Sequence, residues 1–173
     1  MRLDTERLII RPAEVGDAED LHAVYSDPST FDFIGAGEVQ SIGETVARIE
    51  RKMALQAEYG FSLWSVVERA SGRVIGDCGL QLLEGGPDVE LGYKLAREFR
   101  GRGFATEAGR AAIAYGFEEL GLDRIVAVAW PDNSASWGVM EKLGMTFVGP
   151  GRHYGHETVL YEIRKAGSAT PAG

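Results

Sequence analysis

Two glycines separated by one residue stand between a β-like run and a helix-like run, and this arrangement suits an anion. The run Val89–Leu95 leads into a loop with Gly101 and Gly103, and a helical pattern begins at Phe104. The amides of a helix's first turn lack internal partners and carry partial positive charge, and glycines let an anion approach the backbone. A phosphate site is therefore predicted, with a tight turn between solvated arginines as the alternative. The charged neighbours are mostly basic: Arg97, Arg100, Arg102 and Arg110 against Glu98 and Glu107.

The glycine spacing excludes the two commonest nucleotide-binding loops. No segment contains two glycines separated by four residues and followed by Lys and then Ser or Thr, as a P-loop requires. A Rossmann fingerprint needs glycine or alanine three residues after Gly103, where Thr106 stands, and it occurs early in a chain. The segment Gly35–Gln40 fails for the same reason. The phosphate ligand must therefore be of another kind.

Arg100, Gly103 and Ala105 instead fill the pattern R/Q-x-x-G-x-G/A, which resembles the coenzyme A loop of the GNAT superfamily of N-acetyltransferases. The segment PDNSASWGVMEKLGMTFVG is similar to the superfamily's second hallmark, and more closely to its RimJ/RimL-type branch. The opening TERLIIRP is similar to that branch's first strand, so the resemblance covers nearly all of residues 5–165. The hallmark residues are Asn133, Ser136, Glu141, Lys142, Gly144 and Met145.

The resemblance implies acetyl-CoA as co-substrate and no metal. In the family the strand that corresponds to Val89–Leu95 splays from the next one, so the pantetheine arm can pair with its backbone. The pyrophosphate would lie on the amides from Gly101 to Thr106. Asn133 would meet the pantetheine end, or it is a plain helix N-cap, or both. The implied cofactor-binding residues are Tyr93, Lys94, Leu95, Arg100, Gly101, Arg102, Gly103, Phe104, Ala105, Thr106, Asn133 and Ser136.

Acetyl transfer to an amine needs a neutral nitrogen, a polarised carbonyl and a proton for the departing thiolate. By the resemblance, Glu90 would stand beside the thioester and take the amine proton, unless it is a solvated or salt-bridged strand carboxylate. Glu157 is the second candidate base, or an anchor for a cationic amine, unless it points outward. Many members have tyrosine where Met140 stands, and methionine donates no proton. Ser136 is therefore the candidate acid or hydrogen-bond donor to the sulfur.

The resemblance implies direct transfer to a primary amine, either a protein N-terminal α-amine or a small molecule. The loop with Phe31 and Phe33 lies where the family builds one wall of the acceptor pocket, and Asp32 and Glu157 suit a cationic acceptor. No acyl-enzyme is expected, because the single cysteine, Cys78, falls in a strand-like run and is expected in the core. The alternative function is a non-catalytic acyl-CoA-binding sensor or interaction module of the same fold.

The elements that must position these residues alternate along the chain. Helical patterns cover residues 13–27, 41–59 and 104–120 and start again near 133, and strand-like runs cover residues 8–11, 61–68, 73–83, 89–96 and 124–130 before two final strands. This order predicts an α+β fold. The resemblance makes it a GNAT fold, a mostly antiparallel sheet of about seven strands with about four helices, splayed between the fourth and fifth strands. We expect one domain over residues 1–165 and a disordered tail at 166–173.

Composition limits the partners. The 173 residues are 45% apolar with a net charge of −8, which disfavours binding to nucleic acid or to an anionic membrane surface. The amino end lacks the cationic segment and long apolar run of a secretory signal, so a cytoplasmic protein is expected. The sequence leaves open whether the chain is a monomer or a homodimer.

Overall fold

The computed structural model describes residues 1–30 and 41–167. The loop with Phe31, Asp32 and Phe33 and the predicted tail from residue 168 onward lie outside them. The described strands form one sheet in the order β1-β2-β3-β4-β5-β6-β8-β7. The strands are β1 (Leu3–Asp4), β2 (Leu8–Arg11), β3 (Leu63–Glu68), β4 (Val74–Leu82), β5 (Val89–Leu95), β6 (Arg124–Ala129), β7 (Thr146–His153) and β8 (His156–Arg164).

Every neighbouring pair in this sheet is antiparallel except β5 and β6, which are parallel. The predicted mixed, mostly antiparallel sheet is therefore confirmed. The strand beyond the predicted seven is β1, where Leu3 and Asp4 pair with Ile10 and Ile9. Two residues are too few for an alternating pattern to reveal a strand.

Four α-helices cover the sheet, as predicted. They are α1 (Ala18–Tyr25), α2 (Ile42–Tyr59), α3 (Phe104–Glu118) and α4 (Ser134–Lys142), and short 3-10 turns join some of the elements. The start of α2 is a capping box, since Ser41 Oγ accepts from the Glu44 amide and the Glu44 carboxylate accepts from the Ser41 amide. Gly60 ends α2 with a φ of +79°, which glycine adopts without strain.

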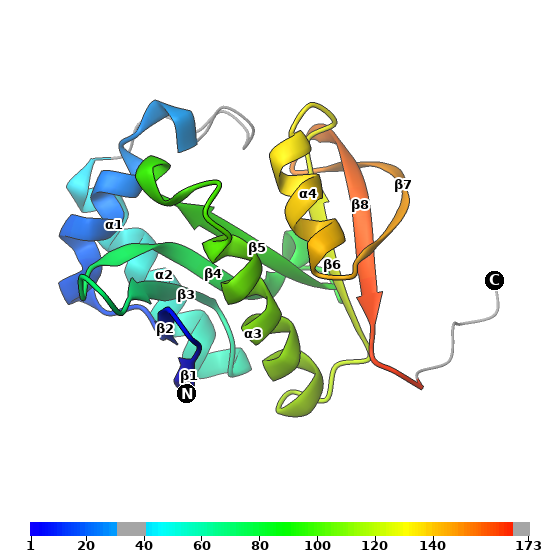
Figure 1. Cartoon of the computed structure of the whole chain (residues 1–173), viewed down its shortest axis with the longest axis horizontal. Helices are drawn as coiled ribbons and strands as arrows, with labels where there is room; N and C mark the ends of the chain where they lie inside the picture. The colour runs from blue at the N-terminus through cyan, green and yellow to red at the C-terminus, as the bar shows by residue number, and fades with distance from the viewer. Residues whose placement is uncertain (31–40, 168–173) are drawn as a thin grey trace.

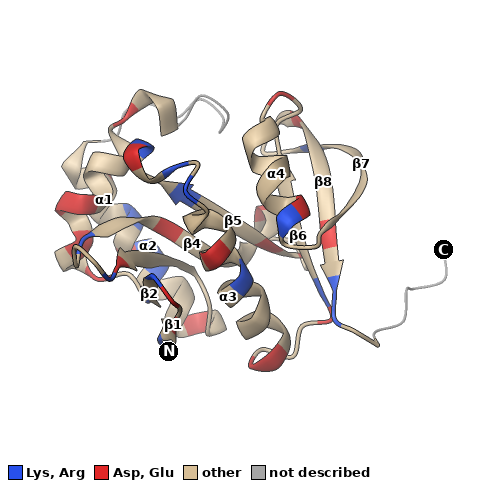
Figure 2. Cartoon of the chain, viewed as in Figure 1, with Lys and Arg blue, Asp and Glu red and all other residues tan. Residues whose placement is uncertain are grey.

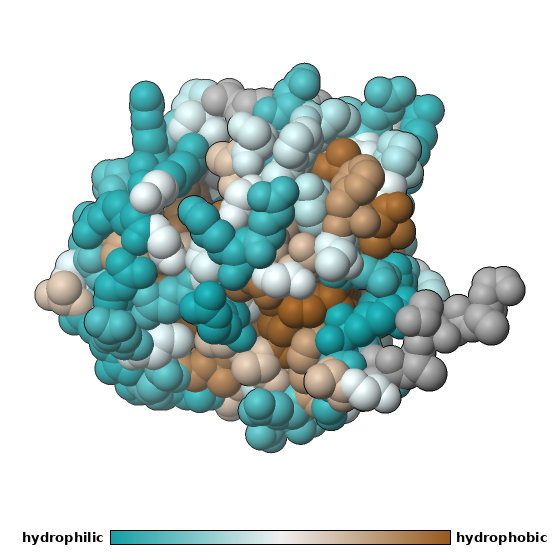
Figure 3. Space-filling model, turned by 45° about the vertical axis from the view of Figure 1, so that its right-hand side comes forward, coloured by the Kyte–Doolittle hydropathy of each residue, from teal (hydrophilic) through white to brown (hydrophobic). Residues whose placement is uncertain are grey.

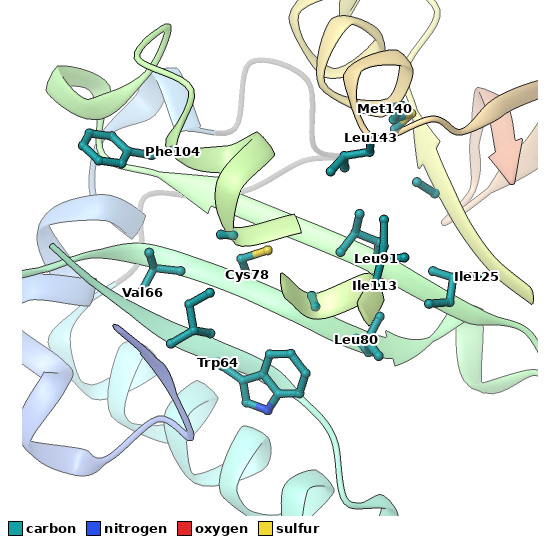
Figure 4. Close-up of a cluster of buried hydrophobic side chains, with 14 of the residues drawn as sticks. Trp64, Val66, Cys78, Leu80, Leu91, Phe104, Ile113, Ile125, Met140 and Leu143 are labelled. Atoms are coloured by element: carbon teal, nitrogen blue, oxygen red, sulfur yellow. The ribbon is translucent and has the colours of Figure 1, made fainter. Parts of the chain in front are cut away.

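The helices lie on both faces of the sheet (Figure 1): α1 and α2 cover one face, and α3 and α4 cover the other. The larger core fills the α3/α4 side, where β3, β4, β5 and β6 meet the two helices (Figure 4). Trp64, Leu80 and Ile125 are completely buried there. A smaller core on the opposite face joins α1 and α2 to β3 and β4 through Leu21, Val24, Tyr25, Ile49, Val67 and Val74.

The sheet opens between β5 and β6. One pair, Glu90 and Val126, is in register, and beyond it the two strands diverge (Figure 1). Among the described residues, the part of β5 that faces the gap, from Leu91 to Leu95, therefore has no strand neighbour on that side. This is the predicted splay, because β5 and β6 are the fourth and fifth strands when β1 is set aside.

Charge and hydropathy vary over the surface. Figure 2 shows basic residues at the end of β5 and in the loop that leads to α3, within a chain whose net charge is −8. On the face in Figure 3, apolar surface gathers in the middle and at the upper right among hydrophilic residues. Among residues 1–30 and 41–167, no helix has the length and apolar character needed to cross a membrane.

Candidate active site

A cavity of about 890 Å³ occupies the gap between β5 and β6. Its walls come from β5, the start of α3, the end of β6, α4 and the tip of the β7–β8 hairpin. Eleven of the twelve predicted cofactor-binding residues line it. They are Tyr93, Lys94, Leu95, Arg100, Gly101, Gly103, Phe104, Ala105, Thr106, Asn133 and Ser136. Residues that the sequence assigned to one cofactor site therefore also lie together in the structure.

The start of α3 presents amides to this cavity. Gly101 and Gly103 have φ angles of +70° and +83°, a region that L side chains rarely adopt. The first hydrogen bond of the helix runs from the Glu107 amide to the Gly103 carbonyl at 3.0 Å. The amides of the first helical residues, from Phe104 to Thr106, therefore have no acceptor within the helix. This geometry fits a phosphate group, which needs hydrogen-bond donors and a backbone without β-carbons.

The two arginines of this loop have other partners. Arg100 donates from its guanidinium to the Leu95 carbonyl, to the Ser29 carbonyl and hydroxyl, and to Thr30 Oγ1, at distances from 2.8 to 3.1 Å. Its side chain thus ties the loop to the end of α1. Arg102 is the one predicted cofactor-binding residue that does not line the cavity. Its guanidinium carbon lies 5.0 Å from the Phe104 ring centroid, so it packs on the outside of the loop.

Ser136 faces the cavity from α4 and is hydrogen-bonded to Tyr93 on β5. The Tyr93 and Ser136 hydroxyl oxygens are 2.7 Å apart, and the Tyr93 hydroxyl also lies 3.1 Å from the Ser136 carbonyl oxygen. Burial raises the pKa of Tyr93 well above its usual range, so the phenol stays protonated at neutral pH. Tyr93 can therefore donate to Ser136 Oγ and leave the serine hydrogen free for another acceptor.

Asn133 sits at the other end of the same turn. Its side-chain oxygen accepts from the Ser136 amide at 3.1 Å, so it is the N-cap of α4. It also lines the cavity. The cap fixes the start of α4 and with it the direction of the Ser136 side chain.

Side chains along β5 alternate between the two faces of the sheet. Tyr93 points toward α4, on the α3/α4 side. Lys94 pairs in register with Asp77, whose carboxylate contacts α1 and α2, and Glu90 pairs with Gln81. Lys94 and Glu90 therefore lie on the α1/α2 side. Because both sets line one cavity, the cavity passes through the sheet.

Glu90 is the one carboxylate among the described residues that line this cavity. Its side chain is 5% exposed and accepts hydrogen bonds from the Tyr154 hydroxyl and from Gln81 Nε2, the latter at 2.9 Å. Burial raises the pKa of Glu90 above its usual range, although these two donors oppose the change. The Lys94 charge also opposes the change, but burial outweighs it, so this carboxylate can take up a proton more readily than an exposed one.

Tyr154 was not identified from the sequence. It lies in the β7–β8 turn with a φ of +53°, which is unusual for a residue with a side chain. Its amide donates to Glu84 Oε1 at 2.7 Å, and Glu84, in the β4–β5 connection, also has a positive φ of 51°. The hairpin tip is therefore fastened across the cavity to the start of β5, with the Tyr154 hydroxyl held against Glu90.

Glu157, the second candidate base, does not line the cavity. It is exposed on β8, whereas the next residue, Thr158, is buried and lines the cavity. Successive side chains of a strand point to opposite faces of the sheet. A role for Glu157 as the base required its side chain to face the cavity, and Thr158 faces it instead. His153 also lines the cavity, with Nδ1 2.6 Å from the Thr158 hydroxyl oxygen.

Two further sequence expectations concern reactive groups. Cys78 is completely buried, and burial raises the pKa of its thiol far above its usual range, so the thiol is not a nucleophile of this site. Among the residues that the structure describes, no cluster of three or more histidine, cysteine, aspartate or glutamate side chains could hold a metal ion.

Comparison with known proteins gives one consistent family. Residues 7–146 match the family model described as "Acetyltransferase (GNAT) domain". YoaA of Bacillus subtilis, named as an uncharacterized N-acetyltransferase, is 33% identical over 170 residues, which are 94% of this chain and 96% of YoaA.

Solved structures agree with this assignment. A GNAT-family acetyltransferase from Bacillus anthracis superposes with a TM-score of 0.82 at 28% identity, covering 95% of this chain and 98% of that one. RimL, described as a ribosomal alpha-N-protein acetyltransferase in complex with coenzyme A, has the same fold, with a TM-score of 0.82 at 18% identity over 95% of this chain and 98% of RimL. The chain belongs to the GNAT family of acetyltransferases.

Proposed function

We propose that this chain transfers the acetyl group of acetyl-CoA directly to a primary amine, either a protein N-terminal α-amine or the amine of a small molecule. The observation that carries the proposal is that one cavity joins the amides at the start of α3, the Ser136 hydroxyl and the Glu90 carboxylate. The N-acetyltransferase names of relatives such as YoaA support transfer to nitrogen. Acetyl-CoA supplies an acyl group activated as a thioester, and the chain supplies the groups that bind it and handle protons.

The donor side of the cavity is the α3/α4 side. The amides from Gly101 to Thr106 would bind the pyrophosphate, since they point outward at the positive end of the helix dipole. The unpaired edge of β5 would bind the amides of the pantetheine arm in the manner of an added strand. A second hollow beside Gly103 is lined by Arg7, Arg110 and Lys142 together with Glu6 and Glu107, and Arg7 pairs with Glu107 at 2.7 Å. Arg110 and Lys142 would be its donors to a further phosphate.

Glu90 is proposed as the proton acceptor. An ammonium group cannot attack a carbonyl, and amines remain protonated at neutral pH, with pKa values of about 8 for an α-amine and about 10.4 for a lysine. Glu90 lies on the α1/α2 side of the same cavity, and its raised pKa makes it a better base than an ordinary carboxylate. It would remove the proton directly or through one water.

Ser136 is proposed as the donor to the thiolate. The serine hydrogen is available when the Tyr93 hydroxyl donates to Ser136 Oγ, and the 2.7 Å separation supports that bond. A serine hydroxyl is a weak acid, so its contribution is a hydrogen bond that stabilises developing negative charge. Tyr93, held protonated by its raised pKa, would keep donating to Ser136 Oγ and so leave the serine hydrogen free for the sulfur.

A panel of primary amines with acetyl-CoA tests the proposal. We expect amine-dependent release of free coenzyme A thiol and a product whose mass increases by one acetyl group. Binding of coenzyme A without turnover on any amine would instead support the alternative, a non-catalytic acyl-CoA-binding module of the same fold.

Two variants separate the donor site from the chemistry. Ser136→Ala should lower kcat by about tenfold, the loss of roughly one good hydrogen bond, with an unchanged Kd for coenzyme A by calorimetry. Gly103→Ala places a β-carbon at a φ of +83° and 3.4 Å from Arg7 Nη2, so it should weaken coenzyme A binding. A Ser136→Ala protein with wild-type kcat would exclude the serine from the reaction.

A further inference from the structure

The cavity carries an excess of positive charge. Four basic side chains line the cavity against the single carboxylate of Glu90 among the described residues, in a chain whose net charge is −8. An acidic protein that concentrates cations at one site has a local field of the opposite sign to its overall charge. The four are Arg48, Lys94, Arg100 and Lys142.

Two of these cations belong to the α1/α2 side. Lys94 shares that face with Glu90, because the two residues are four apart on β5. Arg48 projects from α2, the helix that covers this face. Neither pairs with a carboxylate within residues 1–30 and 41–167, and Arg48 Nε is buried with no hydrogen-bond partner there. A buried donor without an acceptor costs free energy unless a ligand supplies one.

The nearby ion pair does not neutralise them. Asp77 is completely buried and accepts from Lys52 Nζ at 2.6 Å, so this carboxylate already has an ammonium partner. Burial is the largest influence that lowers the pKa of Lys52, and the charges of Lys94 and Arg48 lower it further, against the opposing effect of Asp77. Lys94 and Arg48 therefore lie close enough to Lys52 to repel its charge. Lys94 also acts on Glu90, and within the described residues Asp77 Oδ1 accepts no hydrogen bond from Arg48.

We propose that the acceptor carries an anionic group, a carboxylate or a phosphate, which Arg48 and Lys94 bind while the acceptor's amine lies at Glu90. The inference rests on the proposed function and names its substrate class. Binding an anion would relieve the repulsion between the cations and give Arg48 Nε an acceptor. It also replaces the cationic acceptor expected from Glu157, which is exposed outside the cavity.

The strand itself sets the spacing of the two groups. Four residues of a β-strand span about 13 Å, so the amine at Glu90 and the anion at Lys94 are several bonds apart. An α-amino acid, whose two charged groups share one carbon, cannot reach both positions. A linear ω-amino acid such as aminohexanoate is shorter than this Cα spacing but can bridge the two groups, because the long Lys94 and Arg48 side chains line the same cavity as Glu90. The acceptor class is therefore an amine with a remote acid group.

Matched acceptors test this with three probes built on six carbons: hexylamine, aminohexanoate and aminohexyl phosphate. We expect kcat/KM for the two anionic probes to exceed that for hexylamine by at least about tenfold, as one charge-assisted contact would give. The ratio between the carboxylate and the phosphate identifies which group the site prefers. Equal kcat/KM values for all three probes would overturn the inference while leaving amine acetylation intact.

Variants assign the preference to the two cations. Arg48→Gln and Lys94→Gln should each reduce the preference for aminohexanoate over hexylamine about tenfold. The control is Arg51→Gln, an exposed arginine on the same helix, which should keep the wild-type ratio. Lys94→Glu should reverse the preference toward hexanediamine, an outcome that misfolding cannot produce. A preference unchanged in all three cavity variants would contradict the assignment.

Binding gives an independent readout if no amine is acetylated. Calorimetry of the protein loaded with coenzyme A should show aminohexanoate binding at least about tenfold tighter than hexylamine, and Lys94→Gln should remove the difference. Absent turnover would reject the proposed function, whereas equal or absent binding of the two probes would reject the anionic acceptor. The two failures are therefore distinguishable.

Discussion

Asp77 and Glu90 are buried carboxylates on neighbouring strands, on the same face of the sheet, and the protein surrounds them differently. Asp77 on β4 accepts from the Lys52 ammonium at 2.6 Å and from the Tyr25 hydroxyl. Glu90 on β5 accepts from two neutral donors, Tyr154 and Gln81. Asp77 thus has a full opposite charge in direct contact, whereas the hydrogen-bond donors to Glu90 are neutral and the Lys94 charge acts on it without an ion-pair contact among the described residues.

The pKa values diverge accordingly. Burial alone would raise the pKa of Asp77, but the Lys52 and Lys94 charges and the hydrogen bonds from Lys52 and Tyr25 outweigh burial and lower that pKa to about 2. Burial dominates at Glu90 and raises its pKa. The first carboxylate is fixed as an anion throughout the physiological range, whereas the second is closer to exchanging its proton. The charge of the hydrogen-bond partner, more than the depth of burial, therefore separates a structural ion pair from a candidate base.

The largest expected effect comes from breaking the ion pair. Lys52→Met leaves the Asp77 charge buried without a counter-ion, and removing one partner of such a pair costs about 3–5 kcal/mol of unfolding free energy. Urea unfolding at neutral pH measures it. The exposed neighbour on α2 gives the control Arg51→Met, which should change stability little. Similar stabilities for the two variants would show that the pair contributes nothing.

The next effect concerns Glu90 and should appear in catalysis. Glu90→Gln removes the proton acceptor and keeps the side-chain volume, so kcat should fall about 100-fold. Thermal stability at neutral pH should be unchanged or higher, because an ionised carboxylate is no longer buried. The control is Glu157→Gln, an exposed glutamate, for which near-wild-type kcat is expected. A lower kcat for Glu157→Gln than for Glu90→Gln would instead identify Glu157 as the base.

Lowering the pH should reveal how much the Lys52–Asp77 ion pair contributes to the unfolding free energy of the wild-type protein. The folded pKa of Asp77, about 2, lies below the ordinary value of 3.8, so its contribution is present above about pH 4 and is lost as the pH falls toward 2. A decrease of about 2 kcal/mol in unfolding free energy over this range is expected. The contribution of Glu90 to the unfolding free energy changes with pH in the opposite direction, because its raised pKa favours the folded state at low pH. The decrease should therefore persist in Glu90→Gln and vanish in Lys52→Met.

The smallest expected effect tests how the Tyr154 hydroxyl influences the pKa of Glu90. Tyr154→Phe removes a hydrogen bond that lowers the Glu90 pKa, so that pKa should rise further. The acid limb of the kcat/KM profile should move up by roughly one pH unit or less, as one hydrogen bond allows. Tyr115→Phe is the matched control, because its hydroxyl donates to the Gly60 carbonyl far from the cavity. An acid limb that stays in place would reduce Tyr154 to a packing residue.

Local signals in the sequence predicted the elements well, for a physical reason. The capping box at Ser41 and Glu44 and the left-handed Gly60 depend on residues within one or two turns, so they define the ends of α2 without tertiary information. The same holds for Asn133 as the N-cap of α4. Gly101 and Gly103 mark a loop that only glycine adopts easily, and the structure has positive φ at both.

The site itself depends on contacts that no local pattern encodes. Tyr154 meets Glu90 across 64 positions of sequence, because the β7–β8 hairpin folds back to the start of β5. The register of β8 turns Thr158 into the cavity and Glu157 out of it. Arg100 looked like a phosphate ligand, but its donors reach oxygens of Leu95, Ser29 and Thr30.

The sequence by itself determined where helices start and end and that a glycine loop precedes α3, since these follow from short-range backbone preferences and periodicity. The mostly antiparallel sheet was implied by the family resemblance. Only the tertiary structure decided which side chains share the cavity, how Asp77 and Glu90 acquired different partners, and that Arg48 and Lys94 are left without carboxylates among the described residues. Those outcomes depend on strand register and on contacts between distant segments, which fix the direction of each side chain.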